Sequence, residues 1–383
     1  MFIRQRSLAE RGARVATASA AVALVLAVSG CAGQEAGGAE GGSGEETFEF
    51  TLATGATAGT PNAAAQDWFL DRVEEKTDGR ITFERTATEA LCKMQEVVDC
   101  VRDGRAEIGV TVPDYTPQYF PSTSMVSIPF ESQNAQAITQ TIYEIHRDYE
   151  PARQVMDSNG LHHVATWPVG RFLLGTPDPV SEVDGLEGLR MRASGPIVQQ
   201  VLGEAKANVV ALTAAETYEG VERGVVDGVG GAIDFPVNYK LMEQLPHWSD
   251  PGVGQYSVFG MWLSKDAYES LPDDLKQTFD EVVEEFNTGA AMESFNESAA
   301  TQCQQMLDSP NVETLTAWDD SAVEEWKDQV GDSGRQAWIK LATDQGLEDA
   351  EGILDRYLQG LEEHADLEYT DATTECVEQF ASR

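Results

Sequence analysis

GLRMRASGP, residues 188–196, places Arg190 and Arg192 on one predicted strand, immediately before a helix start. The rest of the chain avoids positive charge: 26 Lys and Arg stand against 65 Asp and Glu, for a formal net charge of −39. Side chains alternate between the two faces of a strand, so the two arginines are expected to point in opposite directions. The stretch therefore presents one arginine to each face of a sheet in a strongly acidic protein.

LTAAETYEGVERGVVDG, residues 212–228, follows and carries the signals of a complete helix. Thr213 and Glu216 predict a capping box, in which the Thr213 side chain accepts from the Glu216 amide and the Glu216 side chain reaches back. Gly224 is placed to end the helix, and residues 225–226 are expected to enter a short strand. The two stretches together predict a strand–helix–strand unit.

The same alternation of strands and helices extends outward along the chain from Phe48. Strand-like patterns cover 48–55, 80–87, 106–113, 162–176 and 256–265, and helical patterns between them cover 61–79, 94–104 and 136–156. Strands separated by helices of this length indicate an α/β layered fold with a largely parallel sheet. The length of the folded part favours two lobes over one domain.

One predicted helix is unusually long. Residues 272–309 open with Pro272, and their apolar residues from Leu275 to Phe295 keep near-helical spacing. At 1.5 Å per residue such a helix is roughly 55 Å long, more than the width of either lobe. It is therefore expected to run across both lobes, with Gly289 as a bend.

Residues 1–31 have the features of a lipoprotein signal peptide. Arginines precede an apolar run that is too short to span a membrane, and VSGC, residues 28–31, resembles a lipobox. Cys31 would then be lipidated and hold the protein on the outer face of the cell membrane, periplasmic or at the cell surface. An ordinary signal peptide with a chance cysteine is the alternative. Residues 32–47, rich in Gly, Ala, Ser and Glu, are predicted to be a flexible linker.

The remaining cysteines, Cys92, Cys100, Cys303 and Cys376, form an even set in an oxidising compartment. Three pairings are formally possible, and Cys92–Cys100 with Cys303–Cys376 is the natural one. Eight residues on one helix would separate the first pair by about 12 Å, too far for a disulfide. Cys92 is therefore expected in the loop before the helix. Zinc is disfavoured because no CxxC spacing is present.

Charge excludes several kinds of partner. A surface this acidic repels DNA, RNA and anionic lipid.

Adjacent His162 and His163 would point to opposite faces of a strand, which argues against a metal site. The glycine-rich DGVGG at 227–231 lacks the spacing of a nucleotide loop, and no GxSxG or HExxH motif occurs. No cofactor, metal or catalytic residue is therefore expected.

The ordered set of segments resembles the solute-binding proteins of TRAP (tripartite ATP-independent periplasmic) transporters, the dicarboxylate-binding receptors. Residues 71–86 and 96–110 resemble the family's opening helices and strands. Residues 184–195 and 214–229 resemble its arginine-bearing strand and its Glu-x-x-Tyr helix, and 263–277 resembles the entry to its long helix. The resemblance covers essentially everything after the linker.

This resemblance implies a periplasmic-binding-protein-like fold, with crossing hinge strands and a long helix that bridges two α/β lobes. Lobe I would comprise 48–168 plus 257–295, and lobe II 169–256 plus 296–383. Solute, usually a carboxylate, would lie in the cleft between them.

The resemblance also assigns site residues. Arg192 would grip the carboxylate, because a planar guanidinium can donate two parallel hydrogen bonds to it; a structural salt bridge is the alternative. Arg171 matches a second arginine that assists in some members. Gly231 stands where many members have asparagine, which removes a polar contact.

Other predicted site residues are less specific. Trp167 and Trp262 would supply apolar walls or simply lie in the core, and Tyr218 would face the cleft or pack its helix. The opposing wall is expected from lobe I, around 52–59 and 110–115.

We therefore expect a non-enzymatic, monomeric receptor that is tethered by lipid and delivers a small organic carboxylate to TRAP permease subunits. A ligand-binding sensory receptor is the alternative, and an exported hydrolase or lyase is a weaker one.

Overall fold

The computed structural model describes residues 46–383, which belong to one compact unit. The predicted signal peptide (1–31), the lipidation of Cys31 and most of the predicted linker (32–47) lie outside the described residues. Within 46–383, no helix is both long and apolar enough to cross a membrane.

The first sheet has five strands in the order β2-β1-β3-β10-β4. These are β1 (Phe48–Thr54), β2 (Ile81–Arg85), β3 (Ile108–Thr111), β4 (Leu161–Pro168) and β10 (Val258–Ser264). β1 pairs in parallel with β2 and β3, whereas β10 runs antiparallel to both β3 and β4.

The second sheet has six strands in the order β11-β9-β5-β8-β6-β7. These are β5 (Leu173–Thr176), β6 (Arg190–Ala193), β7 (Asn208–Ala211), β8 (Gly228–Gly231), β9 (His247–Asp250) and β11 (Thr314–Ala317). β5 is antiparallel to β8 and β9, and the other pairs are parallel.

Both sheets are therefore mixed, not largely parallel as the sequence suggested. The chain crosses from the first sheet to the second between β4 and β5, and returns between β9 and β10. The strands that enter after each crossing, β5 and β10, are those that run antiparallel to their neighbours. The predicted two-sheet fold with crossing strands is confirmed. The residue boundaries of the two lobes stay a prediction.

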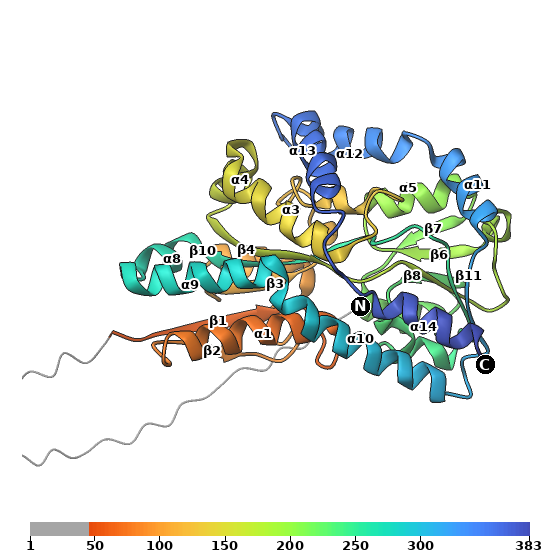
Figure 1. Ribbon diagram of the computed structural model, residues 1–383, viewed down its shortest axis with the longest axis horizontal. Helices are drawn as coiled ribbons and strands as arrows, with labels where there is room; N and C mark the ends of the chain where they lie inside the picture. Colours follow the sequence, from red (N-terminus) through yellow and green to blue (C-terminus); the bar gives the residue numbers. More distant parts are fainter. Residues whose placement is uncertain (1–45) are drawn as a thin grey trace, which may run out of the picture. The chain divides into compact units, whose positions relative to one another are not determined.

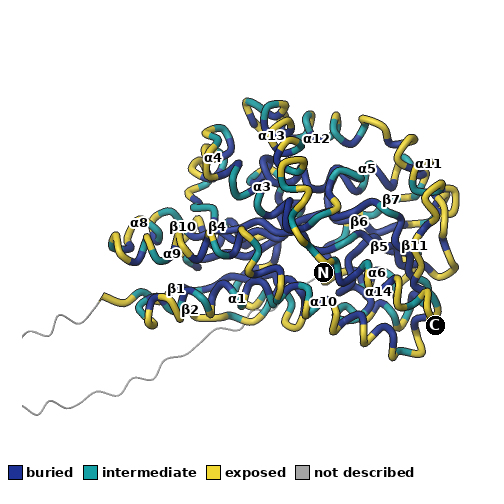
Figure 2. Tube along the Cα trace, in the orientation of Figure 1, coloured by how far each residue is buried: buried dark blue, intermediate teal, exposed yellow. Residues whose placement is uncertain are grey.

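Helices cover the sheets and surround the crossing strands (Figure 1). Those outside the long helix are α1 (Pro61–Lys76), α2 (Val97–Arg102), α3 (Ala135–Asp148), α4 (Glu150–Ser158), α5 (Pro196–Glu204), α6 (Ala214–Glu222), α7 (Asp234–Val237), α8 (Lys265–Ser270), α11 (Asp320–Val330), α12 (Ser333–Asp344), α13 (Ala350–Glu363) and α14 (Ala372–Ala381). Burial is concentrated in the strands and the inward faces of the helices (Figure 2).

The predicted long helix is present and bent where expected. It consists of α9 (Asp273–Glu285), a π-helical segment (Phe286–Ala290) and α10 (Ala291–Asp308). Gly289 in that segment has a φ of 127°, which favours glycine. The buried Asn287 side chain donates to the Val164 carbonyl at 2.9 Å, so it ties the bend to β4. α9 lies beside the first sheet and α10 extends to α14 beside the second (Figure 1).

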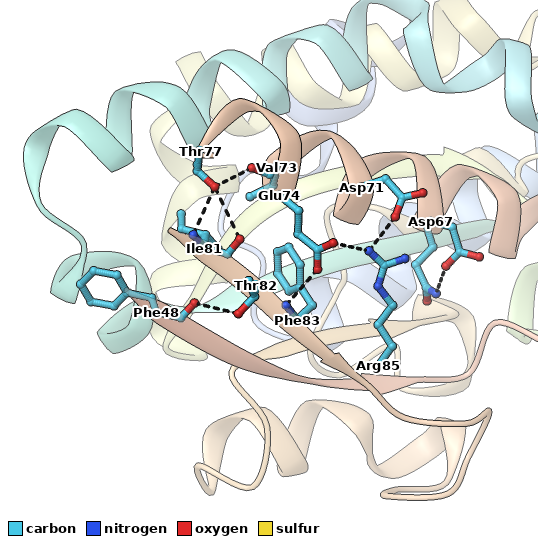
Figure 3. Close-up of polar contacts among 11 residues, drawn as sticks. Phe48, Asp67, Asp71, Val73, Glu74, Thr77, Ile81, Thr82, Phe83 and Arg85 are labelled. Carbon is cyan, nitrogen blue, oxygen red and sulfur yellow. Dashed lines mark hydrogen bonds and ion pairs between the residues drawn. The ribbon is translucent and has the colours of Figure 1, made fainter. Parts of the chain in front are cut away.

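Side chains fasten α1 to β2 (Figure 3). The Thr77 hydroxyl donates to the Val73 carbonyl at 2.7 Å and accepts from the Ile81 amide at 3.1 Å. Glu74 accepts from the Phe83 amide at 3.1 Å and from Arg85 at 2.9 Å. These bonds set the position of the first helix on its sheet, from which its N-terminal end reaches the site described below.

Both predicted disulfides are confirmed. Cys92, in the loop before α2, bonds Cys100 with a Cα–Cα distance of 6.5 Å. Cys303 of α10 forms a disulfide with Cys376 of α14, 73 residues further along the sequence, with a Cα–Cα distance of 5.5 Å.

Two local predictions were wrong. The helix expected over 136–156 breaks at Tyr149, because Pro151 lacks the amide that a continuous helix would need. Residues 225–226 do not begin a strand: their amides bond the Gly220 carbonyl as the helix ends, and β8 starts at Gly228. The capping box of Thr213 and Glu216 is confirmed.

Candidate functional site

A small cavity of about 20 Å³ lies between the two sheets. Residues from both sides of the molecule line it. On the side of the first sheet these are Asn62, Met94, Val112, Tyr115 and Phe259, and Tyr256 and Ser257 lie near the return crossing. On the side of the second sheet they are Val169, Arg192, Ser194, Ala214, Asp234, Phe235 and Tyr239. With the lobes in this arrangement the cavity has room for about one water molecule. A larger solute would require the lobes to separate.

Arg192 is the only arginine or lysine among the residues that line this cavity. It lies on β6, before α5, and only 1% of its surface is exposed. Its guanidinium donates to the Leu212 carbonyl at 2.9 Å and the Gly230 carbonyl at 2.8 Å. No carboxylate of the described chain forms an ion pair with it. A fully buried cation is thus held by neutral groups.

Tyr115 connects the lobes at this point. It ends a short 3₁₀ turn after β3, and its hydroxyl oxygen accepts from Arg192 at 3.0 Å and from the Ala214 amide at 3.1 Å. Burial raises the pKa of Tyr115, so its hydroxyl keeps a proton that is free to be donated. Sequence reasoning placed the opposing wall around 110–115 but did not single out Tyr115.

Two buried carboxyl groups lie close to the arginine. Burial raises the pKa of Asp114 to about 6, although Ser257 and Ser127 donate to it at 2.6 and 2.9 Å. Burial raises the pKa of Asp234 to about 7, against the opposing effect of its own amide and of Arg192. The expected wall at 110–115 includes Asp114, but sequence reasoning singled out neither carboxyl group, because only the folded chain brings them beside Arg192.

The other arginines are engaged elsewhere. Arg190 points away from Arg192, as alternation predicts, and its Nε donates to Asp227 at 2.9 Å near the surface. Arg171 forms an ion pair with Asp250 and donates to Gln133 at 3.0 Å. Arg171 does not line the cavity, so the structure does not bring it together with Arg192.

Trp167, Trp262 and Tyr218 also lie off the cavity lining. Trp167 is buried and donates at 3.1 Å to Asn62, which does line the cavity, so it supports the wall from behind. Trp262 stacks on Phe120 with ring centroids 4.0 Å apart. The Tyr218 hydroxyl donates to Glu243 at 3.1 Å at the surface.

Gly231 makes room for an aromatic ring. A Cβ built on Gly231 would lie 2.4 Å from the Phe235 ring. The Arg192 guanidinium lies over the same ring, with its Cζ 4.8 Å from the ring centroid, in cation–π geometry. The absence of a side chain at Gly231 therefore allows Phe235 to pack on the arginine.

Filling this space should destabilise the protein. Gly231→Ala is expected to cost about 1–3 kcal/mol of unfolding free energy, because the Phe235 ring must move. Gly203→Ala in α5 is the control, since a Cβ there meets no atom within 4 Å. Urea unfolding should show a loss for Gly231→Ala and none for Gly203→Ala; equal stabilities of the two variants would contradict the packing described here.

The paired histidines point to opposite faces, as expected. His162 stacks on Tyr268 with centroids 3.7 Å apart, and His163 on His146 at 4.5 Å. Burial lowers the pKa of His162 and of His146 to about 4. Over residues 46–383, no cluster of three or more metal-ligating side chains is present.

Comparison with protein families gives a match over most of the described chain. The model of the bacterial extracellular solute-binding proteins of family 7, DctP, matches residues 52–337. The chain is 22% identical to the C4-dicarboxylate-binding periplasmic protein DctP of Rhodobacter capsulatus, over 70% of this chain and 80% of that one. It spans 36% of the length of an uncharacterized Sinorhizobium fredii protein and 54% of a Chromohalobacter salexigens solute-binding protein.

Solved structures share the fold. A TRAP solute-binding protein from Rhodoferax ferrireducens, in complex with copurified benzoate, superposes with a TM-score of 0.75 at 21% identity, covering 84% of this chain and 99% of that one. One from Bordetella bronchiseptica with bound mandelate gives 0.71 at 22% identity, covering 82% and 99%.

Proposed function

Because the chain belongs to family 7 of the bacterial extracellular solute-binding proteins, the DctP family, we propose that it captures a small organic carboxylate between its lobes and delivers it to a TRAP-type permease. It acts as a binding protein and performs no chemistry on the solute. The family match supports an extracytoplasmic location. Lipidation of Cys31 would keep the protein on the membrane beside the permease.

Arg192 is the observation that carries the proposal. Arg192 is fully buried, and its guanidinium forms no ion pair with a carboxylate of the described chain, so a ligand carboxylate can pair with it directly. Such a pair gains from charge-assisted, bidentate hydrogen bonds in a site closed to water. The Tyr115 hydroxyl, which accepts from Arg192 and Ala214, has its own proton to donate to the same carboxylate. Related proteins bind C4-dicarboxylates, benzoate and mandelate, all carboxylates, which agrees with this chemistry.

The test is a thermal-shift screen with small carboxylic acids and the amide of each acid. A bound solute stabilises the folded state by RT ln(1 + [L]/Kd), so acids that bind should raise Tm. Their amides should not, because they lack the charge that pairs with Arg192. Equal shifts with an acid and its amide, or turnover of the acid, would contradict the proposal. A sensory role would differ only in the partner that reads the bound state.

Binding should also close the protein. The cavity of about 20 Å³ corresponds to a closed arrangement, and solute must enter while the lobes are apart. A ligand drives closure only through its stronger interaction with the closed form. Small-angle scattering at fixed salt should therefore show a smaller radius of gyration with saturating acid than without it.

The kink at Gly289 is the expected soft point of this motion, since the long helix should bend there and not unfold. An identical scattering curve with and without a bound acid would contradict hinge closure.

A further inference from the structure

We infer that the solute is a zwitterion, whose carboxylate lies on Arg192 and whose cationic nitrogen lies on Asp234. The inference rests on the proposed function, because it takes the carboxylate site as given. It adds the second half of the ligand, for which the sequence resemblance predicts that Gly231 removes a polar contact.

Asp234 lines the cavity and is 6% exposed, yet its Oδ1 is buried without a hydrogen-bond partner in the described chain. An unpaired buried carboxylate oxygen costs free energy unless a donor reaches it. Within this cavity the other charged lining residue is Arg192, whose Nε and Nη1 are committed to backbone carbonyls. The missing donor is therefore expected from the solute.

The balance of charges around the cavity also favours a zwitterionic solute. Two carboxyl groups interact electrostatically with Arg192: Asp234, which lines the cavity, and Asp114, which lies behind it. A plain anion would add a further negative charge to this closed site, whereas a zwitterion leaves its total unchanged. The formal charge of −39 also opposes an approaching anion and leaves a neutral zwitterion unaffected.

Aromatic side chains around Asp234 suit a cation. Tyr239 and Tyr256 line the same cavity, and the faces of such rings attract ammonium groups. Burial raises the pKa of both tyrosines, so they stay neutral and do not compete with Asp234 as anions.

Calorimetry with amino and imino acids, each paired with its deaminated acid, tests the inference. L-proline with cyclopentanecarboxylate is one such pair, because NH₂⁺ and CH₂ differ in charge but hardly in size. In every pair that binds, the zwitterion should bind at least tenfold more tightly. Asp234→Asn should abolish this preference without weakening the deaminated acid. Asp227→Asn, a surface residue paired with Arg190, is the control and should behave as the parent.

Proton exchange provides a second readout at pH 7, from calorimetry in buffers of different ionisation enthalpy. A ligand cation lowers the pKa of Asp234 and should release protons, whereas a bound anion would raise it and take protons up. Of the other titratable groups around Asp234, Asp114 would respond in the same direction, whereas Tyr115, Tyr239 and Tyr256 stay protonated at pH 7 and exchange no protons.

Deaminated acids that bind as tightly as their zwitterions, or proton uptake on binding, would overturn the inference and leave carboxylate capture intact. Failure of both members of every pair would contradict the proposed function itself.

Discussion

Arg192→Ala is expected to weaken binding of the cognate acid by about 2–5 kcal/mol, a loss of thirtyfold to several thousandfold. The substitution removes a charge-assisted contact and leaves the carboxylate in a cavity whose lining then holds Asp234 and no basic residue. Calorimetry measures the effect directly. Arg192→Lys should recover only part of the loss, because an ammonium cannot reproduce the planar fork of the guanidinium.

Arg190→Ala is a matched control for this experiment. Arg190 lies two residues away on the same strand, carries the same charge, and is ion-paired with Asp227 near the surface. Its loss should leave affinity unchanged. If Arg192→Ala bound within threefold of the parent, the carboxylate would have to be anchored elsewhere, and Arg171 would become the candidate.

Removal of the Cys303–Cys376 disulfide should have the largest effect on stability. Closing a loop of 73 residues removes chain entropy from the unfolded state worth about 4 kcal/mol. The bond also joins α10 to α14, so its loss leaves the two helices held together by noncovalent contacts only. Urea unfolding of the Cys303→Ala, Cys376→Ala variant measures the change.

The Cys92–Cys100 disulfide is the internal comparison, because it spans only 8 residues and should contribute about 2–3 kcal/mol on the same basis. The cysteines of both pairs are buried, so alanine leaves similar small gaps at the two sites. A larger loss from the Cys92→Ala, Cys100→Ala variant would contradict the loop-length argument.

Local patterns were sufficient to predict much of the fold. The capping box at Thr213 and the bend at Gly289 depend on residues close together in sequence, and both are present. Cys92 could be placed in a loop because helical rise alone forbids its pairing along a helix. The antiparallel entry of β5 and β10 could not be predicted, since it depends on where the chain crosses between sheets.

The candidate site was predictable only in part. Arg192 was singled out because a strand pattern and a family motif coincide there, and it is fully buried at the cavity. Tyr115, Asp234 and Phe235 reach Arg192 from segments 42 to 77 residues away in sequence, and no local pattern marks that approach. Arg171 was expected to assist as a second arginine, yet it pairs with Asp250 and lies outside the cavity lining.

A crystal structure of the protein with the acid that binds it most tightly tests the central claim most directly. We expect both carboxylate oxygens within about 2.7–3.1 Å of donors, at least one of them on the Arg192 guanidinium and another on the Tyr115 hydroxyl. A solute that fills the cavity with its carboxylate away from Arg192 would contradict the account.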